Sequence, residues 1–400
     1  MLREQFPGLQ TKIHGKPLIY LDNAATAQRP QVVLDAINDY YHNHNANIHR
    51  GVHSLSESAT ELYEQARVSM AQLINAPSEK DLIFVRGCTE GVNLVAQTFV
   101  RERIKAGDEI LISHLEHHSN IVPWQILCEQ TGAVLKVIPM NQEGELVLDD
   151  LDQLINDKTR FMSVVHVSNS LGTINPIKKI IKAAHDKDVP VLVDGAQAMP
   201  HIKVDVQDLD CDFYTVSGHK MYGPTGSGVL YGKTAHLAAM PPYHGGGEMI
   251  SKVTFDSTVY NAVPAKFEAG TPHISGGIGL GAAAEFLMSV GMDKITERDQ
   301  QLKVYTEAAL NEVTGLRIVG TAAKKSPVFS FVIDGIHAHD IGTIIDHHGV
   351  AIRTGHHCTM PIFQYYGLSG TCRASLSFYN TEQDVDVLVE SLNKAIAMFD

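Results

Sequence analysis

The sequence predicts an α/β protein whose larger part is built on a mainly parallel central sheet. Short apolar runs rich in Val and Ile alternate with longer amphipathic stretches, which is the pattern of strands and crossover helices. The 400 residues are 44% hydrophobic and 19% charged, which is typical of a soluble globular protein of two or three domains.

Buried strands are expected at residues 82–85, 109–112, 161–167, 190–193 and 212–216. Each run ends in a polar or glycine-rich turn. Ligands of open α/β sheets bind beyond the carboxyl ends of the strands. Polar residues that follow these runs are therefore the first candidates for a functional site.

The C-terminal part of the chain predicts a second, smaller α/β unit. A long amphipathic helix is expected to start near residue 285, followed by strands at 328–333 and 350–353. We therefore divide the chain into a segment of residues 1–20 that packs with the small domain, a large domain of residues 21–284, and a small domain of residues 285–400.

The charge and the cysteine content exclude several classes of function. The net charge of −13 offers no basic stripe for nucleic acid and argues against adhesion to anionic membranes. No long apolar run or secretory leader is visible, so we expect a cytoplasmic protein. The five cysteines are odd in number and widely scattered, which predicts reduced thiols rather than a disulfide framework.

The turn after the first strand has the composition of an anion-binding site. Segment 86–91 (RGCTEG) contains two glycines and precedes the helical pattern at 92–99. Such a turn directs backbone N–H groups and a helix N-terminus at an anion, and Thr89 adds a hydroxyl donor. The alternative is a helix cap with glycines that only shape the turn.

Charged residues follow two further strands of the predicted sheet. Asp194 comes directly after an apolar run, where an unpaired carboxylate would be costly, and a protonated pyridine nitrogen would be a suitable partner. Lys220 arrives between an apolar strand and a glycine turn, which favours covalent use of its amine. An N-capping Asp and a solvent-directed Lys are the alternatives. Together with the anion-binding turn, these residues supply the parts that a pyridoxal 5'-phosphate (PLP) site requires.

One thiol of the small domain stands among cationic residues. Segment 353–358 (RTGHHC) places Cys358 near two histidines and an arginine, and cationic neighbours favour the nucleophilic thiolate. Zinc binding is the alternative, but no second ligand cluster with metal-site spacing accompanies the segment, so we expect no metal. Cys128 and Cys211 lie in apolar patterns that suit inert thiols.

The whole pattern resembles the group II (SufS-type) cysteine desulfurases, which are fold-type I PLP enzymes of the aspartate-aminotransferase superfamily. The resemblance runs from 20–26 (YLDNAAT) to 373–376 (RASL). Its most specific motifs are 217–220 (SGHK) with 222–226 (YGPTG), 194–197 (DGAQ), and 353–358 (RTGHHC). The fold that it implies is a large PLP-binding domain followed by a small domain that carries the catalytic cysteine loop.

The resemblance also implies a role for each matching residue. Lys220 would hold PLP covalently and later remove the substrate Cα proton, and Cys358 would attack the substrate sulfur and carry it as a persulfide. The remaining implied contacts are Asp194 to the pyridine nitrogen, Gln197 to the phenolic oxygen, His117 on the ring face with a proton-shuttling role, Thr89, Ser217 and His219 to the phosphate, Arg373 and Asn169 to the substrate carboxylate, and Thr271 to the phosphate of a neighbouring subunit in a homodimer.

L-cysteine is the implied substrate, and L-alanine is the implied product. The implied destination of the sulfur is an acceptor protein of SufU or SufE type in iron–sulfur cluster assembly. His339, in segment 337–340 (HAHD), resembles the subset that uses zinc-bearing SufU-type acceptors, with an ordinary surface histidine as the alternative. His49 and Arg50 match a segment near the family's active site without a definite role.

Two residues depart from the family pattern without removing a reacting group. Thr359 stands where the family usually has alanine, and Cys88 occupies a position often held by threonine. Cys88 would then be a second oxidation-sensitive thiol close to the cofactor phosphate.

Two other functions remain compatible with these residues. One is a different fold-type I PLP reaction, such as aminotransfer or selenocysteine lysis with L-selenocysteine as the substrate. Another class is a non-catalytic scaffold for sulfur carriers. An activity that depends on Cys358 would favour desulfuration over a different PLP reaction. Loss of bound PLP from the purified protein would favour the scaffold.

Overall fold

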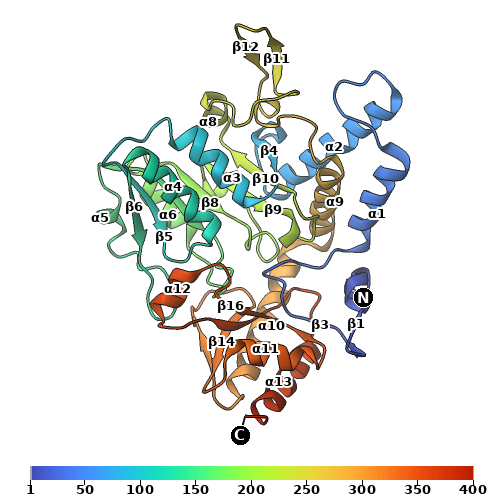
Figure 1. Ribbon diagram of the computed structural model, residues 1–400, viewed down its shortest axis with the longest axis vertical. Coiled ribbons are helices and arrows are strands. Elements are labelled where there is room, and N and C mark those ends of the chain that lie inside the picture. Colours follow the sequence, from blue (N-terminus) through green and yellow to red (C-terminus); the bar gives the residue numbers. More distant parts are fainter. Residues whose placement is uncertain (1, 400) are drawn as a thin grey trace.

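A seven-stranded sheet forms the centre of the molecule (Figure 1). The computed structural model describes residues 2–399. The strand order is β4 (Leu82–Val85), β10 (Gly228–Gly232), β9 (Phe213–Ser217), β8 (Val191–Asp194), β7 (Thr159–Val165), β5 (Glu109–Ser113) and β6 (Val134–Ile138). The pairs from β9 to β6 are parallel, whereas β10 is antiparallel to both β9 and β4. The predicted α/β class with a mainly parallel sheet is therefore confirmed.

The sheet is buried on both faces, which explains why its strands read as continuous apolar runs. In β8, Val191 and Val193 join one hydrophobic cluster while Leu192 joins the cluster on the other face. The first cluster also contains residues of α2 (Ser54–Leu73) and α6 (Ile177–His185). The second contains residues of α3 (Cys88–Val95) and α4 (Val122–Thr131).

Three details of the predicted large sheet are wrong. Two strands were missed: β10 begins and ends in glycine, and β6 is an edge strand whose side chains are mostly exposed, so neither gives a strong apolar run. Asp194 and Ser217 are the last residues of their strands rather than the first residues after them. The helix expected at 92–99 begins four residues earlier at Cys88, because Gly87 ends the turn before it.

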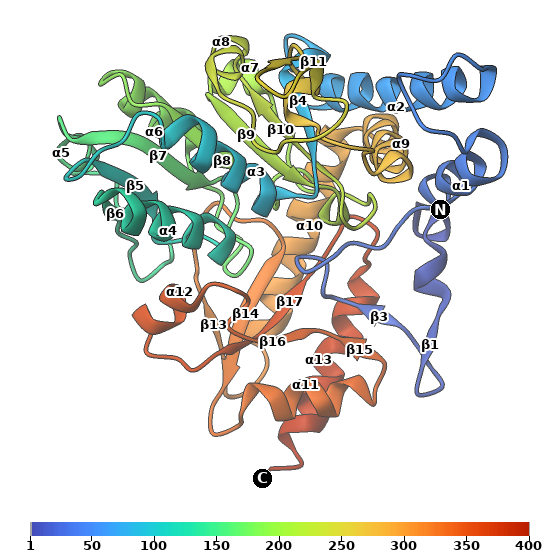
Figure 2. The same ribbon diagram turned by 45° about the horizontal axis from the view of Figure 1, so that its top comes forward.

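A four-stranded antiparallel sheet forms the core of the smaller unit (Figure 2). Its order is β13 (Leu316–Val319), β14 (Val328–Ile333), β17 (Thr371–Ser375) and β16 (Arg353–Gly355), with α10 (Met292–Asn311), α11 (Ala338–Asp346) and α13 (Glu382–Ile396) beside it. The single strand expected at 350–353 is two strands. The first, β15 (Val350–Ala351), pairs with β3 (Ile19–Tyr20), whereas β16 pairs with β17, so the chain leaves one partner for another at Ile352.

The helix expected to start near residue 285 is also divided. α9 (Ile274–Val290) is largely buried among α1, α2 and the large sheet, and a break at Gly291 turns the chain by 76° into α10. The predicted domain division at residues 284 and 285 stays a prediction. Within residues 2–399 no single helix has the length and apolar character to cross a membrane, although α9 and α10 taken as one bent pair meet both criteria.

The other elements are short or peripheral. They are η1 (Leu2–Gln5), η2 (Pro7–Gln10), β1 (Lys12–Ile13), β2 (Lys16–Pro17), α1 (Gln31–Asp39), η3 (Tyr40–His44), η4 (Glu79–Asp81), η5 (Ala96–Val100), η6 (His118–Asn120), α5 (Leu151–Leu154), α7 (Val206–Leu209), η7 (Gly218–Lys220), α8 (Thr234–Ala239), β11 (Ile250–Val253), β12 (Thr258–Tyr260), η8 (Ala265–Phe267) and α12 (Met360–Tyr365).

Candidate active site

A cavity of about 220 Å³ lies at the carboxyl ends of the large sheet, where the smaller unit faces it. Most of the predicted site residues line this cavity: Thr89, His117, Asn169, Asp194, Ser217, His219, Lys220 and Arg373. Ala24, Ala25, Cys88, Ser119, Ala196, Arg353 and His357 complete the lining. Residues from eight separate segments of the chain therefore meet at the edge of the sheet that the strand-end argument predicts.

Opposite charges face each other on neighbouring strand ends. Asp194 ends β8 with 2% of its surface exposed, and its carboxylate accepts a hydrogen bond from the backbone N–H of Ala196 at 2.9 Å. Lys220 ends the short helix that follows β9. Burial lowers the pKa of Lys220, although Asp194 opposes that shift, and burial raises the pKa of Asp194. A lysine whose neutral form is favoured is suited to act as a nucleophile or base.

Two of the three histidines that line the cavity, His117 and His219, have pKa values well below physiological pH. Burial, assisted by the charge of Lys220, lowers the pKa of His117 to about 3 and that of His219 to about 4. His117 Nδ1 accepts a hydrogen bond from the backbone N–H of Ser119 at 3.1 Å. Its proton in the neutral form therefore resides on Nε2.

The predicted anion-binding turn has the expected shape. Gly87 adopts a φ of 141°, and a Cβ there would lie 3.1 Å from Ser217 Oγ. Ser217 Oγ accepts the backbone N–H of Cys88 at 2.9 Å, which joins the end of β9 to the N-terminus of α3. Thr89 is exposed to the cavity at the same helix end. The turn thus combines a positive helix end with hydroxyl donors.

Arg373 is buried on β17 and already has partners for both terminal nitrogens. Nη1 donates to the carbonyl of Asn169 at 2.9 Å, and Nη2 donates to Asp22 Oδ1 at 2.8 Å. Nε and the side-chain oxygen of Asn169 are buried without a hydrogen-bond partner. A substrate carboxylate at Arg373 would therefore meet a guanidinium that Asp22 has oriented in advance.

Cys358 lies in a tight loop between β16 and α12. His357 and Cys358 have φ angles of 49° and 59°, in the left-handed region that favours glycine. The loop is held from the large sheet side, because Asn169 Nδ2 donates to the carbonyl of His357 at 2.7 Å and the backbone N–H of His118 donates to the carbonyl of Cys358 at 2.9 Å. Arg353 Nη2 lies 3.7 Å from the half-buried Cys358 Sγ.

Three predicted residues lie outside the cavity lining: Cys358, which lies on the loop described above, Gln197 and Thr271. Gln197 is buried beside it, with Nε2 donating to the carbonyl of Ala24 at 2.6 Å and Oε1 left without a partner. Thr271 is exposed and lines a different cavity, together with His244 and His273. His49 and Arg50 line a third cavity beside the buried ion pair between Arg67 and Glu268.

Sequence reasoning gave no individual role to Arg353 or Ser119, which both line the cavity. Arg353 pairs directly with Arg373 in the antiparallel register of β16 and β17, and both side chains line the cavity, Arg353 beside the thiol. Only the pairing of two distant segments reveals this. Within residues 2–399, no group of three or more His, Cys, Asp and Glu side chains is placed to hold a metal ion.

The residues present fit PLP. The buried Asp194 is a partner for a protonated pyridine nitrogen, and the unpartnered Gln197 Oε1 marks a buried polar group without its ligand. Lys220 supplies the amine and the 86–91 turn supplies an anion site on the same cavity.

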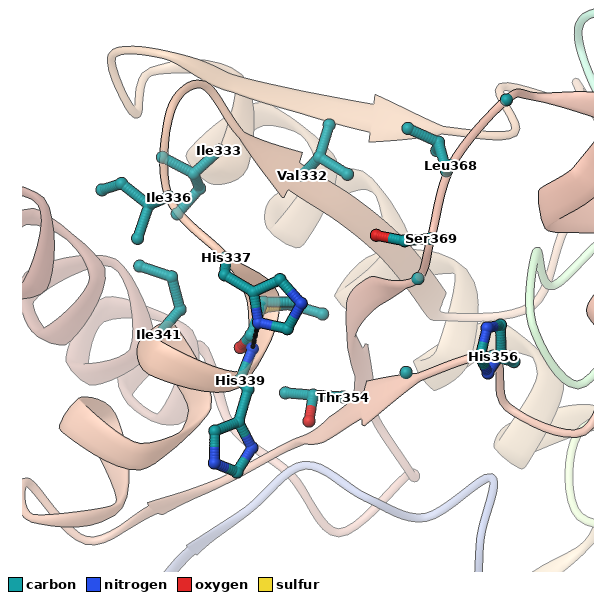
Figure 3. Close-up of a pocket in the computed structure, with 15 residues that line it drawn as sticks. Val332, Ile333, Ile336, His337, His339, Ile341, Thr354, His356, Leu368 and Ser369 are labelled. Carbon is teal, nitrogen blue, oxygen red and sulfur yellow. Dashed lines mark hydrogen bonds between the residues drawn. The ribbon is translucent and has the colours of Figure 1, made fainter.

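A further cavity, of about 550 Å³, lies beside the sheet of the smaller unit and is lined by His356 of the Cys358 loop (Figure 3). His356, two residues before Cys358, lines it together with His337 and His339. The backbone N–H of His339 donates to His337 Nδ1 at 3.2 Å, while the side chain of His339 is exposed. The remaining lining includes the apolar side chains of Ile336, Ile341 and Leu368 and the hydroxyls of Thr354 and Ser369.

Known proteins resemble this chain along nearly its full length. The model of the family "Aminotransferase class-V" matches residues 19–388. A cysteine desulfurase of Salmonella agona is 50% identical over 394 residues, which cover 98% of this chain and 97% of that protein. The crystal structure of the cysteine desulfurase CsdA from Escherichia coli superimposes with a TM-score of 0.92 at 40% identity and covers 99% of this chain and 98% of its own. A cysteine desulfurase of Thermococcus onnurineus matches with a TM-score of 0.93 at 35% identity, over 98% of each chain.

Proposed function

We propose, from the premise that the chain belongs to the aminotransferase class-V family, that Lys220 is its cofactor anchor and Cys358 its sulfur acceptor. The chain is a PLP-dependent cysteine desulfurase, and its fold is that of the fold-type I PLP transferases. The observation that carries the residue assignment is the attachment of the Cys358 loop to the cavity of Lys220, through Asn169 and His118.

The cofactor would be held by residues from both ends of the cavity. Bound PLP supplies an electron sink that makes the substrate Cα–H acidic. Lys220 would hold it covalently, Asp194 would keep its pyridine nitrogen protonated, and Gln197 would bind its phenolic oxygen. His117 would lie on the ring face, and Thr89, Ser217 and His219 would bind the phosphate.

The substrate would be oriented by its carboxylate. Arg373, assisted by the neighbouring Asn169, would bind that group, since Asp22 fixes the guanidinium and its Nε donor has no other partner. This orientation directs the Cα proton of L-cysteine toward Lys220, which would accept it as the base once its amine is free.

The chemical role of Cys358 follows from the balance of the reaction. Its thiolate attacks the substrate sulfur, a sulfur–sulfur bond forms, and the substrate Cβ–S bond breaks. The electron pair of the broken bond remains with the carbon fragment, which takes up protons and leaves as L-alanine. No external oxidant or reductant is needed, because L-cysteine and a thiol become L-alanine and a persulfide.

The decisive experiment compares alanine release from L-cysteine, under reductant, by the native chain, Cys358→Ala and Cys128→Ala. Cys128 lies on α4, away from the cavity lining, and serves as the matched control. We expect Cys358→Ala to lose at least about a hundredfold in turnover while its PLP absorbance is kept. Equal release by all three proteins would show that Cys358 is not the acceptor.

The finer assignment concerns the partners. We propose a SufS-type homodimer in which the partner subunit's Thr271 completes the phosphate site, which is supported by the exposure of Thr271 away from its own cavity. We also propose that a SufU- or SufE-type acceptor collects the sulfur for iron–sulfur cluster assembly. The cavity beside His356, with His337 and His339 on its wall, is the surface that such an acceptor would contact (Figure 3).

A further inference from the structure

His118 has no part in the chemistry described above, yet it contacts the Cys358 loop twice. It opens the short helix η6 directly after His117, which lines the cavity. The side chain of His118 is half-buried and points to the loop rather than to the cavity lining. Two consecutive residues therefore have different environments. His117 lines the cavity, whereas His118 contacts the segment that carries the thiol.

The backbone and the imidazole of His118 bind on either side of the thiol-bearing residue. Its N–H donates to the carbonyl of Cys358 at 2.9 Å. Its Nε2 accepts the N–H of Met360 at 3.1 Å. Met360 begins α12, and the first N–H groups of a helix have no partner within the helix. The imidazole thus caps α12 from another segment, 242 residues away in the chain.

This attachment opposes the local preference of the loop. His357 and Cys358 are both left-handed, a backbone conformation that is unfavourable for L-residues other than glycine. The turn's own bonds, from the N–H and hydroxyl of Thr359 to the carbonyl of His356, do not include Cys358. His118 bonds the backbone of Cys358 and the N–H of Met360, and Asn169 bonds the carbonyl of His357. The loop has further side-chain contacts, from the His357 ring to Thr371, from His114 to the carbonyl of Pro361 and from Arg353 to Cys358 Sγ.

We propose that His118 is a positioning residue that holds the Cys358 loop in its left-handed conformation over the cavity, and so sets the rate of sulfur transfer to the thiol. The inference rests on the proposed function of Cys358. It assigns His118 to the loop alone, not to cofactor loading or substrate binding.

The role requires an imidazole whose Nε2 is an acceptor, because a protonated ring would direct an N–H at the N–H of Met360. Burial and the neighbouring His356 lower the pKa of His118, which keeps that acceptor available. Glutamine is the conservative replacement, since its amide oxygen stands as many bonds from Cβ as Nε2 does. Leucine fills a similar volume and offers no acceptor.

The experiment compares His118→Leu, His118→Gln and a control, His347→Leu, an exposed histidine at the end of α11. Three quantities are measured on each PLP-loaded protein: the cofactor absorbance, kcat and KM for alanine release, and the rate of Cys358 alkylation by iodoacetamide, located by mass spectrometry. In His118→Leu we expect kcat to fall about tenfold and alkylation to rise about threefold, because one net hydrogen bond is lost.

His118→Gln should recover most of both changes, and KM and cofactor absorbance should stay within about twofold throughout. A leucine variant with either readout at the native value would overturn the proposal. So would a glutamine variant that behaves like leucine, or cofactor loss in both. If Cys358→Ala itself kept native alanine release, the proposed function would fail, but the alkylation rates would still report whether His118 holds the loop.

Discussion

The floor and the rim of the cavity are built in different ways. The floor, defined here as Asp194, Ser217 and Lys220, stands on or directly after the neighbouring strands β8 and β9. The rim, defined here as residues 356–359 with Cys358, is a loop in unfavourable backbone conformation held by contacts from other segments. Parallel ladder bonds place the floor, whereas a few side-chain and loop hydrogen bonds place the rim.

This difference indicates which substitutions should abolish turnover and which should only reduce it by modest factors. A floor residue keeps its place when its side chain is altered, because the sheet positions its backbone, so only its chemistry is lost. A rim residue depends on each contact that restrains the loop, so single losses should shift its position and rate by modest factors.

Lys220→Arg should give the largest loss. Arginine keeps a positive charge next to Asp194 but cannot hold the cofactor covalently or exchange a proton at neutral pH. We expect alanine release to fall by about a thousandfold or more, with an unchanged thermal unfolding profile for the fold. Lys182→Arg, on the exposed face of α6, is the control. Turnover within about tenfold of native would contradict the assignment of Lys220.

Arg353 tests the rim and should have a smaller effect. Its guanidinium lies 3.7 Å from Cys358 Sγ, where its positive charge attracts the negative charge of an attacking sulfur. Arg353→Ala should slow both alanine release and Cys358 alkylation by about tenfold, and Arg353→Lys should restore about half of the loss on a logarithmic scale. Alkylation that is equally fast in all three proteins would show that the charge of Arg353 does not act on the thiol.

The same contrast explains how far the sequence predicts the site. Asp194 could be found because a charged side chain directly after an apolar run is unusual, and Lys220 because a lysine between an apolar strand and a glycine turn is also unusual. In both cases the run places the residue at the sheet edge. Cys358 could be singled out by its neighbours in the chain. Their placement around one cavity or on its rim agrees with the strand-end argument, while their roles in the reaction stay predictions.

The remaining features depend on contacts that no local pattern contains. The pairing of Arg353 with Arg373 follows from the register of β16 with β17, and the hold of His118 on Met360 joins segments 242 residues apart. The change of partner at Ile352 was missed because two strands of two and three residues, separated by this single residue, read as one strand. Hydrophobic periodicity reports burial, not the identity of the partner strand.

Beneath the floor and the rim lies a buried carboxyl group that belongs to neither. Glu116 directly precedes His117 and has no exposed surface. Its carboxyl oxygens are hydrogen-bonded to the Ser113 hydroxyl, to Asn120 Nδ2 at 2.6 Å and to the N–H of Val165 at 2.8 Å. The last bond continues the contact of β5 with β7 beyond their final paired residues, so Glu116 braces the strand end from which His117 and His118 emerge.

Glu116→Gln should leave turnover nearly unchanged but alter the dependence of stability on pH. Burial raises the pKa of Glu116 to about 8, so the folded state holds a proton that the unfolded chain releases near pH 4.5. The associated stability is complete below about pH 4.5 and is lost as the pH rises toward 8, by up to about 3 kcal/mol between pH 5.5 and 8. At pH 5.5 the thermal midpoint of Glu116→Gln should be lower than that of the native protein, because an amide N–H of glutamine faces another donor. Glutamine cannot titrate, so between pH 5.5 and 8 the midpoint of the variant should fall less than the native midpoint does. Parallel pH profiles of the two midpoints would show that Glu116 is ionised in the folded protein. A tenfold loss of turnover at pH 7 would mean that Glu116 acts on the rim as well as on the sheet.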